Sequence, residues 1–272
     1  MCELFAISSR HPTRVTFSLD EFARHGGDQG PHRDGWGLAF YQDGDAQIFR
    51  EAEPAATSEW MHFLRNHQHH SQCIISHIRK ATQGERALRN TQPFSCEIAG
   101  SRHVFCHNGN LSDIHDNIEA THFTPIGETD SEYAFCFLMA QVEKLWHNGR
   151  PELAQRLELI HSVFDRFAEL GPANFLYSDG EYLYAYANRR TQSNGACEPP
   201  GMHYLCRDCD CDQQAKPLTG LEISAGRTSS RQTIVLFASV PLSSERWVPF
   251  QANQLIVAAE GRLIEVQNYS CA

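Results

Sequence analysis

Two Asp-Gly dipeptides, each set between short apolar runs, place the strongest limits on how this 272-residue chain can fold. Asp-Gly is a preferred sequence for the two-residue turns that join antiparallel strands. The flanking segments are 36–41 and 47–49 around Asp43-Gly44, and 174–178 and 181–186 around Asp179-Gly180. The sequence therefore predicts two β-hairpins, and with them antiparallel sheet structure.

Helical periodicity comes in two consecutive segments. Thr129 and Glu132 have the spacing of a capping box, and apolar residues follow at helical intervals as far as Leu145. A second helix is predicted to open at Pro151 and to stop by Gly171. We also expect a helix over 56–69, buried strands over 2–8, 73–77 and 103–107, and late strands over 233–240, 254–258 and 262–266. Hairpins and paired helices indicate an α+β fold rather than a doubly wound parallel sheet.

Composition excludes several classes of protein. The net charge of −10 argues against nucleic acid as the main partner, because phosphate binding needs a basic surface. No run approaches the roughly 20 apolar residues of a membrane span, and the N-terminus lacks the pattern of a secretory signal. We therefore expect a cytoplasmic protein with no membrane partner. No internal repeat or long linker divides the chain, so residues 1–272 are interpreted as one domain.

Cys2 is the first candidate for chemistry. A cysteine near a terminus is usually a small buried hydrophobe. If Met1 is removed, however, Cys2 gains a free α-amine, whose reference pKa of about 7.7–8.0 suits a general base at neutral pH. Nucleophile and base then lie on the same residue, the N-terminal variant of the nucleophile–base pair.

Three further motifs follow predicted strand ends or open a predicted helix. Arg79, just past the strand 73–77, can grip a carboxylate with its guanidinium fork, although taken alone it is better interpreted as a surface arginine in one ordinary ion pair. Asn108 and Gly109 offer the side-chain amide and backbone N–H of an oxyanion hole, although Asn-Gly alone indicates a turn. Asp130 is typical of a helix first turn and can instead pair with an ammonium group. Together with a thiol at Cys2, these groups match the needs of an amino-acid amide.

These residues carry a specific resemblance. Cys2 is followed by His-x-Arg-x-Ala-Thr over 77–82, His-Asn-Gly over 107–109 and Glu-Thr-Asp-Ser-Glu over 128–132. This order resembles the glutaminase domain of the class II glutamine amidotransferases. Asp34-Gly35-Trp36-Gly37, residues 174–180 and Pro241-Leu242 followed by Trp247 also resemble its small stand-alone members, so the match spans nearly the whole chain.

The resemblance implies a fold and a set of roles. The fold would be the four-layer αββα sandwich of N-terminal nucleophile hydrolases, with two antiparallel sheets between helix layers, and residues 1–272 would form a single type-2 glutamine amidotransferase domain. The substrate would be glutamine or a γ-glutamyl small molecule. The implied catalytic residues are Cys2 as nucleophile and Asn108 and Gly109 as oxyanion hole; the implied substrate-binding residues are Arg79 for the α-carboxylate and Asp130 for the α-ammonium, with Thr82 and His77 in support.

The sequence departs from the larger synthetases of this family in three places. They have Trp after the motif Arg, where Lys80 stands here, and an Arg three residues before Asp34, where Pro31 stands and Arg33 is offset. Their Asn-x-His-Pro motif reads Asn90-Thr91-Gln92-Pro93. These changes leave the core chemistry intact. They affect how the pocket closes and where an ammonia acceptor would bind.

Three functions stay open on the sequence alone. The favoured one is a hydrolase of glutamine or γ-glutamyl compounds, because the glutaminase-like match leaves no stretch of the sequence for an acceptor domain. The second is a glutaminase subunit that passes ammonia to a separate synthase partner. The third is a non-catalytic ligand-binding module on the same fold, which retention of Met1 would indicate.

A Cys-x-x-Cys motif with a third thiol, Cys206, Cys209 and Cys211, lies close to His203. Zinc sites usually need a second well-spaced pair, and Cys197 is the only other thiol nearby in the sequence. We favour a loop or strand end with incidental thiols, and expect no metal. No Walker loop or dinucleotide fingerprint occurs either, so no cofactor is expected.

Overall fold

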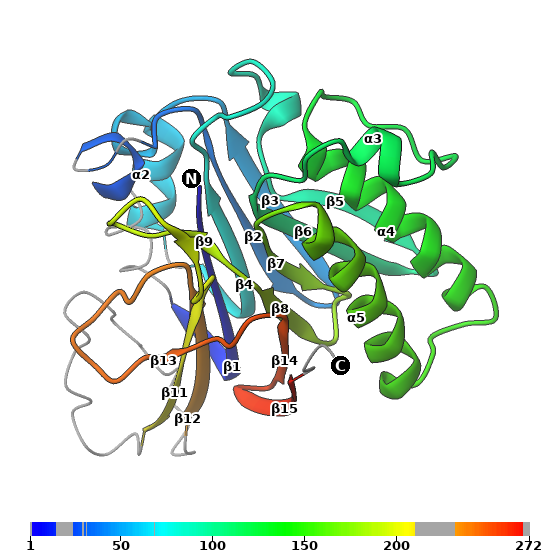
Figure 1. Ribbon diagram of the computed structural model, residues 1–272. Coiled ribbons are helices and arrows are strands. Elements are labelled where there is room, and N and C mark those ends of the chain that lie inside the picture. Colours follow the sequence, from blue (N-terminus) through cyan, green and yellow to red (C-terminus); the bar gives the residue numbers. More distant parts are fainter. Residues whose placement is uncertain are drawn as a thin grey trace.

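Two antiparallel sheets lie face to face in this protein (Figure 1). The computed structural model describes residues 2–14, 24–28, 30, 32–67, 69–209 and 232–268. The first sheet has seven strands in the order β13-β11-β12-β1-β4-β2-β3, and the second has six in the order β15-β14-β8-β7-β6-β5. Strands β9 and β10 form a separate two-stranded ribbon.

The strand bounds follow the chain. The first sheet contains β1 (Glu3–Arg14), β2 (Trp36–Gln42), β3 (Asp45–Glu51), β4 (His70–Ile78), β11 (His203–Cys209), β12 (Gln232–Ala238) and β13 (Val248–Pro249). The second contains β5 (Phe94–Ile98), β6 (Ser101–Gly109), β7 (Ala173–Ser178), β8 (Leu183–Ala187), β14 (Gln254–Ala259) and β15 (Arg262–Asn268). The ribbon consists of β9 (Arg190–Thr191) and β10 (Cys197–Glu198).

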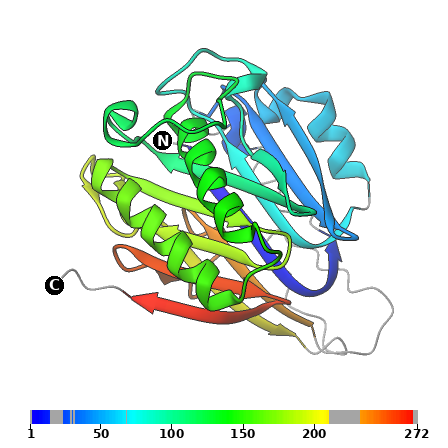
Figure 2. The ribbon, with the colours of Figure 1, turned by 90° about the vertical axis from the view of Figure 1, so that its right-hand side faces the viewer.

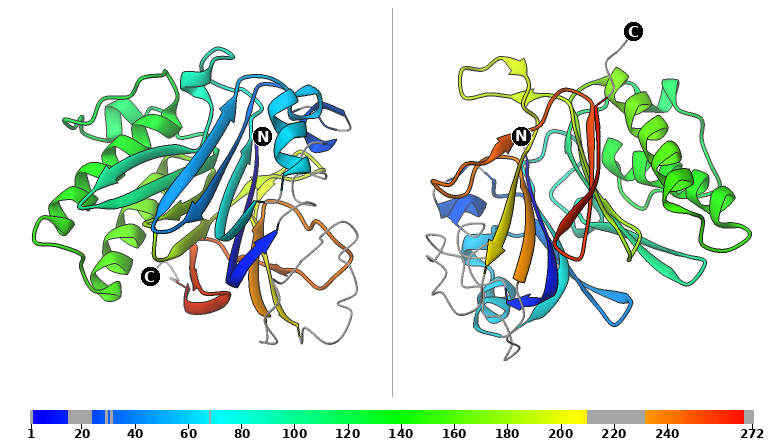
Figure 3. Two further views of the ribbon diagram at one scale, coloured as in Figure 1. Left: turned by 180° about the vertical axis from the view of Figure 1, so that it is seen from behind. Right: turned by 90° about the horizontal axis from the view of Figure 1, so that it is seen from below.

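Helices cover the outer face of each sheet. The long helices α4 (Asp130–Trp146) and α5 (Leu153–Leu170) pack on the second sheet (Figure 2). Helix α2 (Glu59–Asn66) packs on the outer face of the first sheet (Figure 3). Short elements are α3 (Ile114–Asn117), η1 (Arg24–Asp28), η2 (Ala55–Thr57) and η3 (Leu88–Asn90).

Alternation of side chains along the strands builds the layers. In β1, Leu4 and Ala6 face the second sheet, whereas Phe5 and Ile7 pack toward α2. In β6, Val104 and Cys106 face the first sheet. One apolar layer therefore fills the space between the sheets, as the two-residue period of a strand requires. The predicted four-layer α+β architecture is confirmed.

The predicted hairpins and helices are present, with shifted ends. Helix α5 begins at Leu153 rather than at Pro151, because Glu152 is the N-cap and shares a capping box with Gln155. Helix α2 is shorter than the predicted 56–69, because Ser58 caps it by accepting a hydrogen bond from Met61 N. Strands β5, β11 and β13 were not predicted. Among the described residues, no helix is both long enough and apolar enough to cross a bilayer.

The capping box predicted at Thr129 forms only in part. Its side chain accepts a hydrogen bond from Glu132 N at 3.2 Å. The Glu132 carboxylate does not return to the cap; it accepts from Ile126 N at 3.0 Å and Gly127 N at 2.7 Å. Glu132 thus stabilises the loop before α4, which borders the pocket described below.

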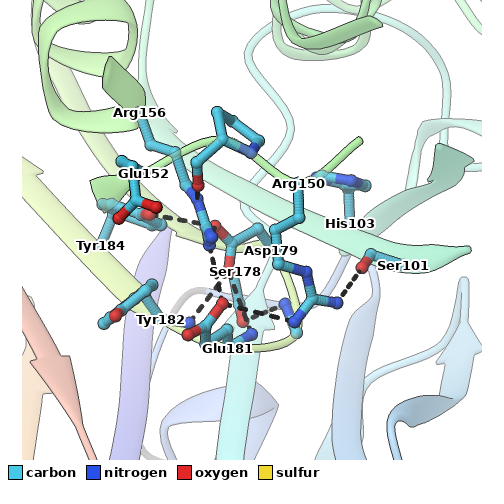
Figure 4. Close-up of polar contacts among 12 residues, drawn as sticks. Ser101, His103, Arg150, Glu152, Arg156, Ser178, Asp179, Glu181, Tyr182 and Tyr184 are labelled. Atoms are coloured by element: carbon cyan, nitrogen blue, oxygen red, sulfur yellow. Dashed lines mark hydrogen bonds and ion pairs between the residues drawn. The ribbon is translucent and has the colours of Figure 1, made fainter. Parts of the chain in front are cut away.

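A buried ion pair joins α5 to the turn of the β7–β8 hairpin (Figure 4). Arg156 Nη1 lies 3.0 Å from Asp179 Oδ2, and the Asp179 side chain is 1% exposed. Asp179 also accepts hydrogen bonds from Tyr184 Oη at 3.0 Å and from the backbone N–H groups of Glu181 and Tyr182. One carboxylate therefore shapes the turn and ties it to the helix layer.

Candidate active site

The ends of four elements meet around one small pocket. Cys2 lies just before β1 and Arg79 just after β4, and the pairing of β1 with β4 makes these two ends neighbours. Gly109 ends β6, and Asp130 begins α4. Five of the seven predicted site residues line the pocket: Cys2, Arg79, Thr82, Gly109 and Asp130.

The Cys2 thiol is held by backbone. Lys80 N lies 3.4 Å from Cys2 Sγ, and Sγ lies 3.5 Å from Lys80 O. Burial raises the pKa of the Cys2 thiol, a rise that the Lys80 backbone hydrogen bond and the positive charge of Arg79 oppose. Because the net shift is upward, the resting group at neutral pH is the thiol, and it needs a base to become a nucleophile.

Arg79 is 3% exposed, and its guanidinium is oriented by a turn of the chain. Nη1 donates to Glu85 O at 3.0 Å, and Nη2 donates to Gln83 O at 2.8 Å and Gly84 O at 3.1 Å. An arginine carries five N–H donors, so two remain for a ligand. The structure thus places a fixed, buried cation at one side of the pocket.

Asp130 supplies the opposite charge. Its Oδ2 accepts from Leu111 N at 2.7 Å, and its Oδ1 accepts from Ser131 N at 2.8 Å. With a third bond from Ser131 Oγ to Oδ1 at 3.3 Å, three hydrogen bonds fix the carboxylate, and its remaining lone pair can accept from an ammonium group. The side chain of Thr129 caps α4 and so fixes the start of that helix, whose first residue is Asp130.

Gly109 lines the pocket at the end of β6. Asn110 N, the next residue, donates to Pro172 O at 3.0 Å, so the N–H of Gly109 points away from β7. The N–H of His107, two residues earlier, points to the same side as that of Gly109 and donates to Gln92 Oε1 at 2.6 Å. Strand β5 pairs with β6 only as far as Phe105, so no residue of β5 lies opposite Gly109. A Cβ at position 109 would lie 1.7 Å from Pro172 O, so the close approach of the two strands requires glycine.

Asn108 is next to Gly109 in the chain but is not among the residues that line the pocket. It is fully buried, and its Nδ2 is 3.2 Å from Ser239 Oγ. Its Oδ1 is buried and accepts no hydrogen bond from the residues that the structure describes. The backbone oxygen of Asn108 accepts from Asn174 Nδ2 at 2.8 Å, which explains the position of Asn174 at the start of the neighbouring strand.

The two supporting residues of the motif lie in different surroundings. Thr82 is exposed at the pocket mouth. His77 is fully buried on β4, and burial lowers the pKa of His77 to about 3, with the nearby Arg79 charge adding to the effect. His77 is therefore neutral at physiological pH and lies outside the pocket lining.

Sequence reasoning did not single out Gln92 and Ser131, although both line the pocket. Gln92 clamps the backbone of His107 by accepting from its N–H and by donating to its carbonyl at 3.2 Å. Ser131 Oγ lies 2.9 Å from His107 Nδ1, and His107 Nε2 lies 3.3 Å from Pro172 O. These contacts fix the β6 end that carries Gly109. The only signal for Gln92 was its place in a motif where larger relatives have His.

Asp34 and Asn90 connect the pocket loops. Asp34 Oδ2 accepts from Ala81 N at 2.8 Å, which ties the residue to the segment after Arg79. Asn90 Nδ2 donates to Glu128 Oε2 at 2.7 Å and to Glu85 O at 3.0 Å. Arg33, the offset arginine, is exposed, and Pro31 lies outside the described residues.

The thiol motif is only partly within the described residues. Cys206 is exposed on β11, whereas the Cys209 side chain and Cys211 lie outside the part of the chain that the structure describes. Within that part, no three His, Cys, Asp or Glu side chains are grouped as metal ligands. The expectation that these thiols bind no metal stays a prediction.

Comparisons with known proteins decide the family. The family model of class II glutamine amidotransferases matches residues 1–271. "Putative glutamine amidotransferase YafJ" of Escherichia coli is 31% identical over 97% of this chain and 97% of its own length. A crystal structure titled "predicted glutamine amidotransferase from Pseudomonas aeruginosa" superposes with a TM-score of 0.69 at 26% identity, covering 97% of this chain and all of that one.

The chain belongs to the class II glutamine amidotransferases. The resemblance predicted from the motifs is thereby confirmed. The fold also matches the Bacillus subtilis glutamine phosphoribosylpyrophosphate amidotransferase, with a TM-score of 0.60, at 12% identity. This chain covers half of that enzyme, so the likeness supports the fold alone.

Proposed function

We propose that this protein is an amidohydrolase in which Cys2, freed at its α-amine by removal of Met1, attacks the side-chain amide of glutamine or of a γ-glutamyl compound. One observation carries the proposal: a backbone-held thiol, a buried guanidinium and a buried carboxylate line the same small pocket in a chain of this family. The cation and the anion match the α-carboxylate and α-ammonium of an amino acid.

The first half of the reaction forms a thioester. The α-amine of Cys2 takes the thiol proton, directly or through a water, and the sulfur adds to the amide carbon. Asn108 and the N–H of Gly109 stabilise the negative oxygen of the tetrahedral intermediate. The C–N bond then breaks, and the leaving nitrogen takes the proton from the protonated α-amine of Cys2. This step releases ammonia or an amine.

The second half consumes water. The α-amine removes a proton from water, the hydroxide oxygen adds to the γ-glutamyl thioester, and the C–S bond breaks. The products are glutamate and the restored Cys2 thiol. Arg79 holds the α-carboxylate and Asp130 the α-ammonium through both halves, so that the γ-carbon stays beside the sulfur.

Water is the acceptor that we assign. The two half-reactions described above are complete with water, and they use only groups of residues that lie within the family match over 1–271. A glutaminase subunit that feeds a separate synthase is distinguished by its dependence on that partner for activity.

Steady-state assays of the purified protein test the proposal. Glutamine and several γ-glutamyl peptides are compared as substrates, with glutamate release as the readout. Cys2→Ala should abolish hydrolysis in a folded protein, and Cys197→Ala, which removes an exposed thiol on β10, should not. Full activity of Cys2→Ala would end the proposal, and activity that appears only with a co-purifying protein would favour the subunit function.

A further inference from the structure

Ser239, directly after β12, bridges the two sheets beside the nucleophile. It is 1% exposed. Leu4 N donates to Ser239 Oγ at 3.0 Å, and Ser239 N donates to Leu4 O at 3.0 Å. The same hydroxyl lies 3.2 Å from the side-chain amide of Asn108, on β6 of the opposite sheet. One serine therefore connects the strand that begins next to Cys2 with the residue assigned to the oxyanion hole.

The hydrogen bonds of this group are incomplete as placed. Ser239 Oγ accepts from both Leu4 N and Asn108 Nδ2, so its proton has no acceptor among the described residues. Asn108 Oδ1 has no donor among them either. A buried polar group without a partner costs about 1–3 kcal/mol. This orientation of the amide therefore leaves two buried groups unpaired side by side, the Ser239 hydroxyl proton and Asn108 Oδ1.

A half-turn of the Asn108 amide pairs both groups. The oxygen and nitrogen of an amide have nearly the same shape, so a rotation of 180° exchanges them without moving other atoms. Ser239 Oγ then still accepts from Leu4 N and donates its proton to Asn108 Oδ1. The Asn108 NH₂ group takes the place that the unpartnered oxygen now occupies.

The freed NH₂ group belongs to the face of β6 that meets the nucleophile. Side chains alternate along a strand, so Asn108 lies on the same face as Cys106, which packs between the sheets. Cys2 lies two residues before Leu4, whose side chain packs in the same layer between the sheets as Cys106, so Cys2 lies on the side of β1 that faces β6.

We propose that Ser239 is a positioning residue for the oxyanion hole: its hydroxyl donates to the Asn108 side-chain oxygen, so that the Asn108 N–H faces the carbonyl oxygen of the substrate on Cys2. This inference rests on the proposed function. The opposite orientation would turn a carbonyl oxygen toward a developing negative charge. Loss of one oxyanion donor typically costs about 10²–10³ in rate, and loss of its orientation should cost part of that.

Ser239→Ala tests the inference through the split between catalysis and binding. We expect kcat for the best substrate to fall about 10- to 100-fold with KM within about threefold. Affinity for glutamate γ-semialdehyde, whose hemithioacetal oxygen would occupy the hole, should fall about tenfold, whereas affinity for glutamate and the rate of Cys2 alkylation by iodoacetamide should not change. Ser239→Thr keeps the hydroxyl and should retain most of kcat.

Ser76→Ala is the matched control. Ser76 is also 1% exposed, and its Oγ donates to Phe5 O of β1 at 3.1 Å, so this variant removes a buried serine contact to the same strand without touching Asn108. It should keep kcat within about threefold. If Ser239→Ala does not fold, Ser239→Cys, which keeps the size but donates weakly, is compared with Ser239→Thr.

The outcomes distinguish the positioning role of Ser239 from the proposed function. Ser239→Ala with kcat within threefold of an active wild type, or equal losses in Ser239→Ala and Ser76→Ala, would overturn the positioning role and leave the proposed function standing. No hydrolysis by wild type, or full activity in Cys2→Ala, would overturn both, and is recognised without any Ser239 variant.

Discussion

The thiol of Cys2 and the backbone of Lys80 bind each other where β1 begins and β4 ends, with Lys80 N 3.4 Å from Sγ. This contact explains how the chain tolerates lysine at a position where larger relatives have tryptophan. The backbone N–H and C=O hold the sulfur, and any residue other than proline supplies both.

Lys80→Ala should therefore leave kcat within about threefold of wild type. The side chain is removed, but the two backbone contacts to Sγ remain. Steady-state kinetics with the best γ-glutamyl substrate measure this. A tenfold or larger fall would show that the lysine side chain itself takes part, and that the backbone contact is not what matters at this position.

Arg79→Lys should raise KM by about 10- to 100-fold, which corresponds to about 1.4–2.8 kcal/mol, with a smaller effect on kcat. A lysine ammonium has three donors on one atom. It cannot donate to both Gln83 O and Glu85 O, as Arg79 does, and also bind a substrate carboxylate. Arg86→Lys is the control, because Arg86 is an exposed residue of the same loop that pairs with Glu53. Equal KM changes in the two variants would contradict the assignment.

The pH dependence of kcat/KM should report the α-amine. Burial raises the pKa of the Cys2 thiol, so the thiol stays protonated at neutral pH and the rate depends on an unprotonated base. A free α-amine has a reference pKa of about 7.7–8.0, so activity should rise through this range and be lost as pH falls below it. Because the pKa of His77 is lowered to about 3, that residue does not titrate in this window. A flat profile between about pH 6 and 9 would contradict the α-amine as base.

Arg156→Met should lower the free energy of unfolding by about 3–5 kcal/mol, because it leaves the Asp179 carboxylate buried without its cation. Asp179→Asn added to it should cost less than the sum of the two single changes. Arg166→Met is the control: its pair with Glu119 is exposed, and such pairs contribute about 0–1 kcal/mol. Denaturant unfolding of the four variants measures these costs, and a cost for Arg156→Met no larger than for Arg166→Met would contradict the structural role of the pair.

Local patterns were enough to predict most of the fold. The turn at Asp43-Gly44 and the spacing of apolar residues after Thr129 act over a few residues, and both appear as predicted. Strand β11 was missed because its alternation is interrupted by charged residues, and it is defined by pairing with β12, nearly 30 residues further on. Helix α5 begins two residues after Pro151 because Glu152 acts as its cap, a choice that depends on the side chain of Gln155.

The sequence could predict which residues converge on the site, because residue type and motif were enough for that. It could not predict how side chains such as those of Asn108 and Gln92 are oriented. Cys2, Arg79, Gly109 and Asp130 lie at ends of elements and converge on one pocket. The burial of Asn108 and its contact with Ser239, 131 residues away in the chain, could not be read from an Asn-Gly dipeptide, because the contact depends on how the two sheets pack. The clamp of Gln92 on His107 is likewise a product of the sheet edge, where β5 stops and a side chain continues the pairing.

Intact mass of the expressed protein, before and after treatment with the glutamine-analogue electrophile 6-diazo-5-oxo-L-norleucine, tests the central claim most directly. The account predicts a polypeptide that lacks Met1 and gains one label, mapped to Cys2, with labelling prevented by excess glutamate. Retention of Met1, or a label on a cysteine other than Cys2, would contradict it.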